Sequence, residues 1–110
     1  MSKHILEAIL DELPYPVQQE QLFYPKRRFR LDYLIELPND KKIAIEYEGG
    51  VFSRGRHNRA GGFISDCTKY NYLAVLGIPL LRYTVKHTQE PSLIYDEINA
   101  VINRLNQYLL

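Results

Sequence analysis

Three carboxylates on two predicted strands are the residues of this chain best suited to do chemistry. Asp32 lies in one alternating apolar–polar stretch, and Glu46 and Glu48 lie in the next. Facing side chains of an antiparallel pair have Cβ atoms about 5 Å apart, so acids on one face repel unless a cation lies between them. Oxygen ligands without His or Cys suit Mg²⁺ or Mn²⁺ better than zinc. The pattern predicts a metal site at Asp32, Glu46 and Glu48.

Structural ion pairs are the competing interpretation of the same acids. Carboxylates on strands often pair with basic side chains, here Arg30 or Lys69, and such networks resemble active sites. Judged from these residues alone, the metal site and the ion pairs both remain open.

The turn between the two strands decides whether the acids can meet. If Leu37 pairs with Lys41, Asp32 lies opposite Glu46, whereas a slip of one residue points the two acids to opposite faces. A three-residue turn over residues 38–40 gives the first register, because its Asn and Asp tolerate the left-handed conformation that such a turn needs. We therefore expect Asp32 and Glu46 to share a face.

Hydrophobic periodicity predicts the elements that position these residues. Helices are expected at 2–13, 63–76 and 91–110, and strands at 20–24, 29–37, 42–48 and 78–84. The last strand must run parallel to the one before the crossover helix. The order α-β-β-β-α-β-α predicts an α/β fold, a mixed four-stranded sheet flanked by helices.

The predicted helices carry apolar stripes, and one strand carries a clean alternation. The residues expected to share one side of the strand at 29–37 are Phe29, Leu31, Tyr33, Ile35 and Leu37. The expected stripe of the first helix is Ile5, Leu6, Ile9, Leu10 and Leu13. That of the crossover helix is Phe63, Cys67, Tyr70 and Ala74, with Cys67 as a small core residue.

Length and composition predict a single globular domain over residues 1–110. Hydrophobic residues make up 45% and charged residues 25%, which excludes wholesale disorder. A single Cys excludes an internal disulfide and fits a reducing compartment. Because residues 73–81 are the longest apolar run and Glu7 and Asp11 interrupt the first one, we expect neither a membrane span nor a signal peptide. The expected location is the cytoplasm of a bacterial cell or of a phage-infected host.

Charge is unevenly distributed although the net charge is only +1. Residues 26–69 hold ten basic against six acidic side chains, which predicts a polyanionic partner for the middle of the chain. Phosphate backbones are bound by such basic segments. The predicted nucleic-acid-binding residues are Lys26, Arg27, Arg28, Arg54, Arg56 and Arg59.

These residues together resemble the PD-(D/E)xK phosphodiesterase superfamily, over about residues 20–84. The acidic half of the resemblance is Phe23-x-Pro25, then residues 27–32 and 43–50. The remainder is similar to small phage and bacterial nucleases of restriction-endonuclease-like fold, and it is the more specific part. It comprises Gly55, Arg56, His57, Gly62, Phe63, Asp66, Lys69, Tyr70, Asn71, Leu76, Gly77 and residues 81–84.

The resemblance implies a restriction-endonuclease-like αβββαβα core and Mg²⁺-dependent cleavage of a nucleic-acid backbone. It makes Asp32 and Glu46 metal ligands. Glu48 stands where the motif has Lys, so Glu48 would bind metal or orient the attacking water, and Lys69 on the crossover helix would supply the positive charge. If neither holds, the chain would bind without cleaving.

Two further roles follow from the resemblance. Glu20 is the expected accessory acid, with Glu7 on the first helix as its rival. His57 would contact the scissile phosphate or act as a base, since its unperturbed pKa is near neutral. We therefore expect a Mg²⁺- or Mn²⁺-dependent endodeoxyribonuclease, with RNA not excluded as substrate. The alternatives are an inactive nucleic-acid- or partner-binding domain of the same fold, and a homodimeric enzyme specific for branched DNA.

Overall fold

Four strands form one mixed sheet in the computed structural model, which describes residues 2–23, 29–49 and 60–107. The strands lie in the sheet in chain order. The first three pair antiparallel, and the fourth pairs parallel with the third. The strands are β1 (Val17–Leu22), β2 (Arg30–Glu36), β3 (Lys42–Tyr47) and β4 (Leu80–Tyr83). The predicted α/β class and its mixed four-stranded sheet are confirmed.

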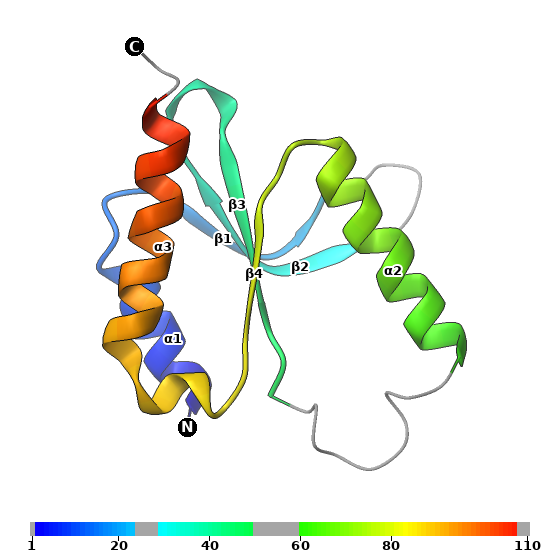
Figure 1. The fold of residues 1–110 in the computed structure, drawn as a ribbon, viewed down its shortest axis with the longest axis horizontal. Coiled ribbons are helices and arrows are strands. Elements are labelled where there is room, and N and C mark those ends of the chain that lie inside the picture. The colour runs from blue at the N-terminus through cyan, green and yellow to red at the C-terminus, as the bar shows by residue number, and fades with distance from the viewer. Residues whose placement is uncertain (1, 24–28, 50–59, 108–110) are drawn as a thin grey trace.

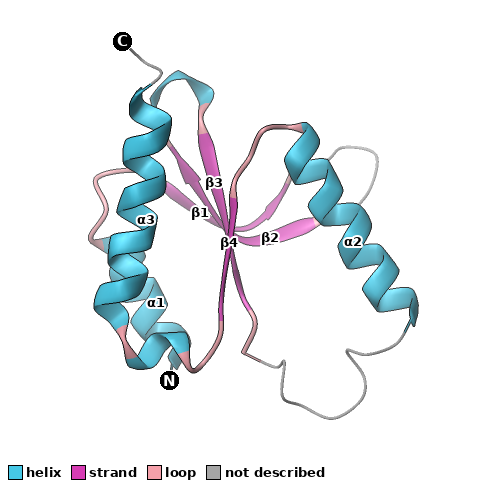
Figure 2. Ribbon diagram, in the orientation of Figure 1, coloured by secondary structure: helices cyan, strands magenta, loops and turns pink. Residues whose placement is uncertain are grey.

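Three α-helices in the described part of the chain cover the two faces of this sheet (Figure 1). They are α1 (Ser2–Asp11), α2 (Ala60–Val75) and α3 (Pro91–Asn106). Helices α1 and α3 lie together on one side, and α2 lies on the other (Figure 2). Helix α2 therefore makes the expected crossover between the parallel strands β3 and β4. No helix among the described residues has the length and apolar character needed to cross a membrane.

The register of β2 and β3 is the one that the turn predicts. Tyr33 pairs with Ile45, and the Leu37 N–H donates to the Lys41 carbonyl at 2.8 Å. The turn is a short 3₁₀ segment, Pro38–Asp40, and Asp40 adopts the left-handed conformation with φ 62°. Continuing this register by one position places Asp32 opposite Glu46.

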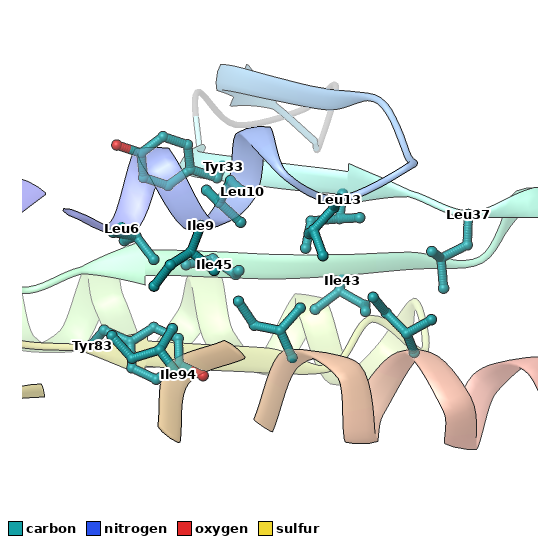
Figure 3. Close-up of a cluster of buried hydrophobic side chains, with 13 residues drawn as sticks. Leu6, Ile9, Leu10, Leu13, Tyr33, Leu37, Ile43, Ile45, Tyr83 and Ile94 are labelled. Carbon is teal, nitrogen blue, oxygen red and sulfur yellow. The ribbon is translucent and has the colours of Figure 1, made fainter. Parts of the chain in front are cut away.

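The main hydrophobic core lies between the sheet and the pair α1–α3. Alternate residues of β2 and β3 point into it, because successive side chains of a strand point to opposite faces. Figure 3 shows Ile45 of β3 near Ile9 of α1 and Ile94 of α3, and Ile43 further along β3, on the side of Leu13. Ile98 and Ile102 extend the stripe of α3, as the sequence predicts.

A smaller cluster lies on the other face, where α2 packs. It is made of Leu31, Leu34, Ala44 and Leu73, which are 4% exposed or less. Leu31 was expected on the face of Tyr33 and Ile35, and this expectation is wrong. The neighbouring strand β1 is irregular at this point. Its Glu20, which lies opposite Asp32 in the register, has φ 53°. The irregular residue lies in β1, and strict alternation along β2 does not describe the packing of Leu31.

The predicted stripe of α2 is also wrong. Phe63 is 65% exposed, and Cys67 and Ala74 are exposed as well. Of the predicted stripe only Tyr70 packs against the sheet, half-buried, and Leu73, which was not in that stripe, is the buried contact. Figure 1 shows that the N-terminal half of α2 extends away from the strands, so apolar residues there have no strand of the described chain beneath them. Ala74, in the last turn, is exposed because it lies on another face of the helix than Leu73.

Other boundaries differ in smaller ways. Helix α1 ends at Asp11, and Ile5 is 39% exposed instead of buried in its stripe. Strand β1 starts at Val17, before the expected position 20. Gly77 ends α2 as predicted, with φ 73°, and the Ile78 N–H donates to the Leu73 carbonyl at 2.9 Å.

Candidate active site

Asp32 and Glu46 lie next to the last backbone pair of β2 and β3, Tyr33 with Ile45, and there each side chain contacts the backbone of the other strand. The Asp32 N–H donates to Glu46 Oε2 at 2.9 Å, and the Tyr47 N–H donates to Asp32 Oδ2 at 2.8 Å. Each carboxylate thus accepts a hydrogen bond from the backbone of the other strand. The two acids that the register predicts to be neighbours lie together on the same side of the sheet as α2.

Lys69 reaches these acids from α2. Its ammonium Nζ lies 2.5 Å from Glu46 Oε1, and the two side chains are only 13% and 8% exposed. Residues 69, 70 and 73 lie on one face of the helix, so the buried Leu73 that anchors α2 on Leu34 and Ala44 also directs Lys69 to the sheet. Lys69 is therefore in the position that the resemblance implies, and it is also the partner that the ion-pair interpretation names.

Burial and pairing act on Glu46 in opposite directions. Desolvation raises its pKa, while the ammonium of Lys69 and the N–H of Asp32 lower it. The net effect is a pKa above the ordinary value of a glutamate, because the burial effect is the largest. A cation added beside the carboxylate would oppose this effect and favour the charged form.

Glu48 lies on the same side of the sheet but has a different partner. Its Oε2 lies 3.4 Å from Arg82 Nη2, and its N–H donates to the Tyr83 carbonyl at 2.7 Å. The Arg82 guanidinium is 4.7 Å from the centre of the Tyr70 ring. Burial and Glu48 raise the pKa of the Tyr70 hydroxyl, against a lowering by Arg82. Glu48 thus pairs with an arginine that is itself stacked on the Tyr70 ring.

The three predicted ligands do not form one compact group. Among residues 2–23, 29–49 and 60–107, no set of three His, Cys, Asp or Glu side chains is close enough to hold a metal ion. Asp32 and Glu46 fit Mg²⁺ as a pair, because this ion is commonly held by one or two carboxylates with waters and substrate phosphate as its other ligands. Their donor chemistry therefore fits the implied metal without Glu48.

Both candidates for the accessory acid lie near Tyr33. The Tyr33 hydroxyl donates to Glu7 Oε2 at 2.6 Å. Burial, this hydrogen bond and the charges of Asp32 and Glu20 all raise the Tyr33 pKa. Glu20 itself pairs with Arg30 at 3.3 Å, and both side chains are more than half exposed. Glu7 reaches Tyr33 from α1, on the side of the sheet opposite to Asp32 and Glu46, and Glu20 is paired with Arg30, so these contacts join neither candidate to the two acids.

The remaining predicted residues lie outside the described part of the chain, so their roles stay predictions. They are Lys26, Arg27, Arg28, Arg54, Arg56, His57 and Arg59.

Sequence reasoning included Tyr70 and Arg82 in the resemblance and Tyr70 in an apolar stripe, but it gave neither of them a role at the site. Arg82 is the register partner of Glu46 across the parallel pair β3–β4, and this pairing depends on the length of the crossover. A signal was present nonetheless, since a lone arginine interrupts the apolar stretch of residues 78–83. A charged residue in a short buried strand indicates a specific partner.

The arrangement combines two carboxylates, an ammonium and a stacked guanidinium on one face of an α/β sheet. Such a set can hold a divalent cation and contact phosphate oxygens. Comparison of the chain with known protein families, with curated proteins and with solved structures gives no match. The geometry of the site and the sequence pattern are therefore the basis for a functional proposal.

Proposed function

We propose that this protein is a Mg²⁺- or Mn²⁺-dependent endonuclease that hydrolyses phosphodiester bonds of DNA. The observation that carries the proposal is the convergence of Asp32, Glu46 and Lys69, which come from three different elements separated in sequence. The order αβββαβα and the mixed sheet would then correspond to a restriction-endonuclease-like core. The resemblance of residues 20–84 to the PD-(D/E)xK superfamily supports the same assignment.

Asp32 and Glu46 would hold the metal, which when bound neutralises phosphate charge and lowers the pKa of a water. Their hydrogen bonds from the Tyr47 and Asp32 N–H groups fix the direction of both carboxylates before substrate arrives. Such preorganisation avoids reorganisation during reaction.

Lys69 would stabilise the negative charge that develops on the phosphate. Its ammonium is already directed at the site by Glu46, and its low exposure strengthens its electrostatic effect. This placement lets a lysine from α2 serve where the motif position itself holds Glu48. In the proposal, Glu48 acts through Arg82 and is not required as a ligand.

The test is cleavage of supercoiled plasmid and of labelled linear and branched DNA with Mg²⁺ or Mn²⁺. Wild-type protein is compared with Asp32→Asn and with Glu36→Gln, an acid on the same strand at the far end of β2. We expect metal-dependent cleavage by wild type and Glu36→Gln, and loss of cleavage with retained DNA binding in Asp32→Asn. Equal cleavage by all three proteins would refute the assignment.

One observation favours an inactive binding domain as the second candidate. Both acids are already engaged, Glu46 with Lys69 and Asp32 with the Tyr47 N–H, and Glu48 occupies the lysine position. These contacts are also what a purely structural network would make. Salt-sensitive DNA binding without turnover under any metal condition would select this candidate.

A further inference from the structure

Two cations of the described residues lie beside the acids, Lys69 on α2 and Arg82 on β4, and Arg82 is the more accessible. Its side chain is 50% exposed, against 13% for Lys69. Arg82 pairs in register with Glu46, and register partners of a parallel pair point to the same side of the sheet. The guanidinium therefore lies next to the proposed site and still faces solvent.

An aromatic platform holds this guanidinium in place. Arg82 Cζ lies 4.7 Å from the centre of the Tyr70 ring, and Lys69 Nζ lies 5.7 Å from the same centre. Tyr70 packs against the cluster of Leu34 and Leu73, so the ring is itself supported. A stacked guanidinium loses less conformational freedom on binding than a free arginine does.

The contact with Glu48 is loose enough to leave donors for a ligand. The separation of 3.4 Å is long compared with about 2.8 Å for a strong charge-assisted hydrogen bond. An arginine has five N–H donors in a planar fork, and two of them can bind one phosphate. Glu48 can thus orient the fork while another edge of it takes a ligand.

We propose that Arg82, stacked on Tyr70 and oriented by Glu48, binds a backbone phosphate of duplex DNA next to the phosphate at Asp32 and Glu46. This rests on the proposed function for the position of the scissile phosphate. The phosphate contact itself can be measured without cleavage. The role accounts for Glu48 at the lysine position, because its carboxylate is needed to orient a phosphate-binding residue.

The test is the salt dependence of binding to a fluorescein-labelled DNA duplex in EDTA, where no cleavage occurs. Arg82→Met and Arg82→Gln are compared with wild type and with Arg104→Met, an exposed arginine of α3 on the opposite side of the sheet. Each phosphate contact contributes about 0.9 to the slope of log K against log salt. We expect both Arg82 variants to lower the slope by about that amount and Arg104→Met to leave it unchanged.

A second pair of variants tests the platform. Tyr70→Leu removes the ring, and Tyr70→Phe keeps it. We expect Tyr70→Leu to weaken binding about two- to fivefold with the slope retained, and Tyr70→Phe to bind like wild type. Circular dichroism of each variant confirms that it is folded.

The two proposals fail separately. If wild type cleaves DNA but the Arg82 variants keep its slope, the phosphate contact is refuted and the nuclease assignment stands. If wild type cleaves nothing but the Arg82 variants lower the slope, the contact holds and the nuclease assignment fails. Absence of duplex binding by wild type at low salt would overturn the contact.

Discussion

The two faces of the sheet are built for different purposes. The face toward α1 and α3 carries thirteen buried residues in one continuous cluster, including Ile45 and Ile98. The face toward α2 has a buried cluster of four, and beside it lie Glu46, Lys69 and Arg82. Charged groups displace apolar packing on the second face. The first face holds the larger apolar core, and the proposed function assigns the reacting groups to the second.

Ile45 and Glu46, adjacent on β3, allow the two faces to be compared by single substitutions. Ile45 is fully buried on the α1–α3 face, and Glu46 is 6% exposed on the α2 face. Glu46→Gln keeps the size of the side chain and an oxygen for the Asp32 N–H. We expect cleavage to fall by at least about 10³-fold, since metal-based stabilisation of the transition state is worth several kcal/mol. The measurement is kcat/KM on plasmid DNA, with urea unfolding as the control.

Unfolding free energy should fall by no more than about 1–2 kcal/mol in Glu46→Gln, because the amide oxygen can still accept from the Asp32 N–H or from Lys69 and the burial cost of the carboxylate is removed, which offsets part of the lost ion pair. A large loss of stability together with a modest loss of cleavage would make Glu46 a structural residue. The comparison of the two faces would then fail.

Ile45→Ala should produce the opposite result. Removing a fully buried isoleucine leaves a cavity in the large cluster, so we expect the free energy of unfolding to fall by about 3 kcal/mol. The kcat/KM of the folded protein should stay within about twofold of wild type, because no group of the site is removed. Ile64→Ala is the matched control on α2, where the side chain is 62% exposed and the expected change is within about 0.5 kcal/mol.

The same contrast explains what the sequence predicts well. The stripes of α3 and the alternation of β3 are dense and regular, and a dense apolar pattern has one favourable way to be buried. The turn at 38–40 has the length and residue types that fix one register, so the meeting of Asp32 and Glu46 follows from local chemistry. These parts depend on short-range information.

The residues on the α2 face are brought together by elements far apart in the sequence. Their contacts were predicted less well than those of the other face. Phe63 and Cys67 have the spacing of a buried stripe, but the path of the crossover carries them beyond the sheet. The stack of Arg82 on Tyr70 requires the register of β4 against β3, which no local pattern encodes. Leu31 packs in the α2-side cluster, opposite to what strict alternation predicts, and the neighbouring strand β1 has a left-handed residue, Glu20, beside Asp32. Sequence reasoning thus placed the acids and Lys69, but not the stack of Arg82 on Tyr70 beside them.

Lys69 tests whether the charges of the α2 face serve stability or reaction. Lys69→Met removes the partner of Glu46, and we expect cleavage to fall about 10²-fold because a positioned charge is lost. Stability should fall by about 1–3 kcal/mol, since a buried acceptor loses its donor. Lys86→Met, on an exposed residue near α3, is the control.

The double variant Lys69→Met/Glu46→Gln sharpens this result. Replacing the unpaired carboxylate by an amide should restore most of the stability lost in Lys69→Met, but no cleavage. Recovery of both properties would show that neither residue takes part in the reaction.

Tyr83 provides the smallest test, on the face that we assign to stability. Its hydroxyl donates to Glu97 Oε1 at 3.1 Å, and burial together with this acid raises its pKa. A tyrosine whose pKa is raised on folding contributes stability that is fully present below its unfolded pKa of about 10 and lost as pH rises through the folded value. Tyr83→Phe should therefore cost about 1 kcal/mol at neutral pH, and the deficit should shrink above about pH 10. Urea unfolding of wild type and variant across this range measures it. A deficit that stays constant with pH would mean that Tyr83 does not titrate differently in the folded protein, and the alkaline weakening of this face would then need another source.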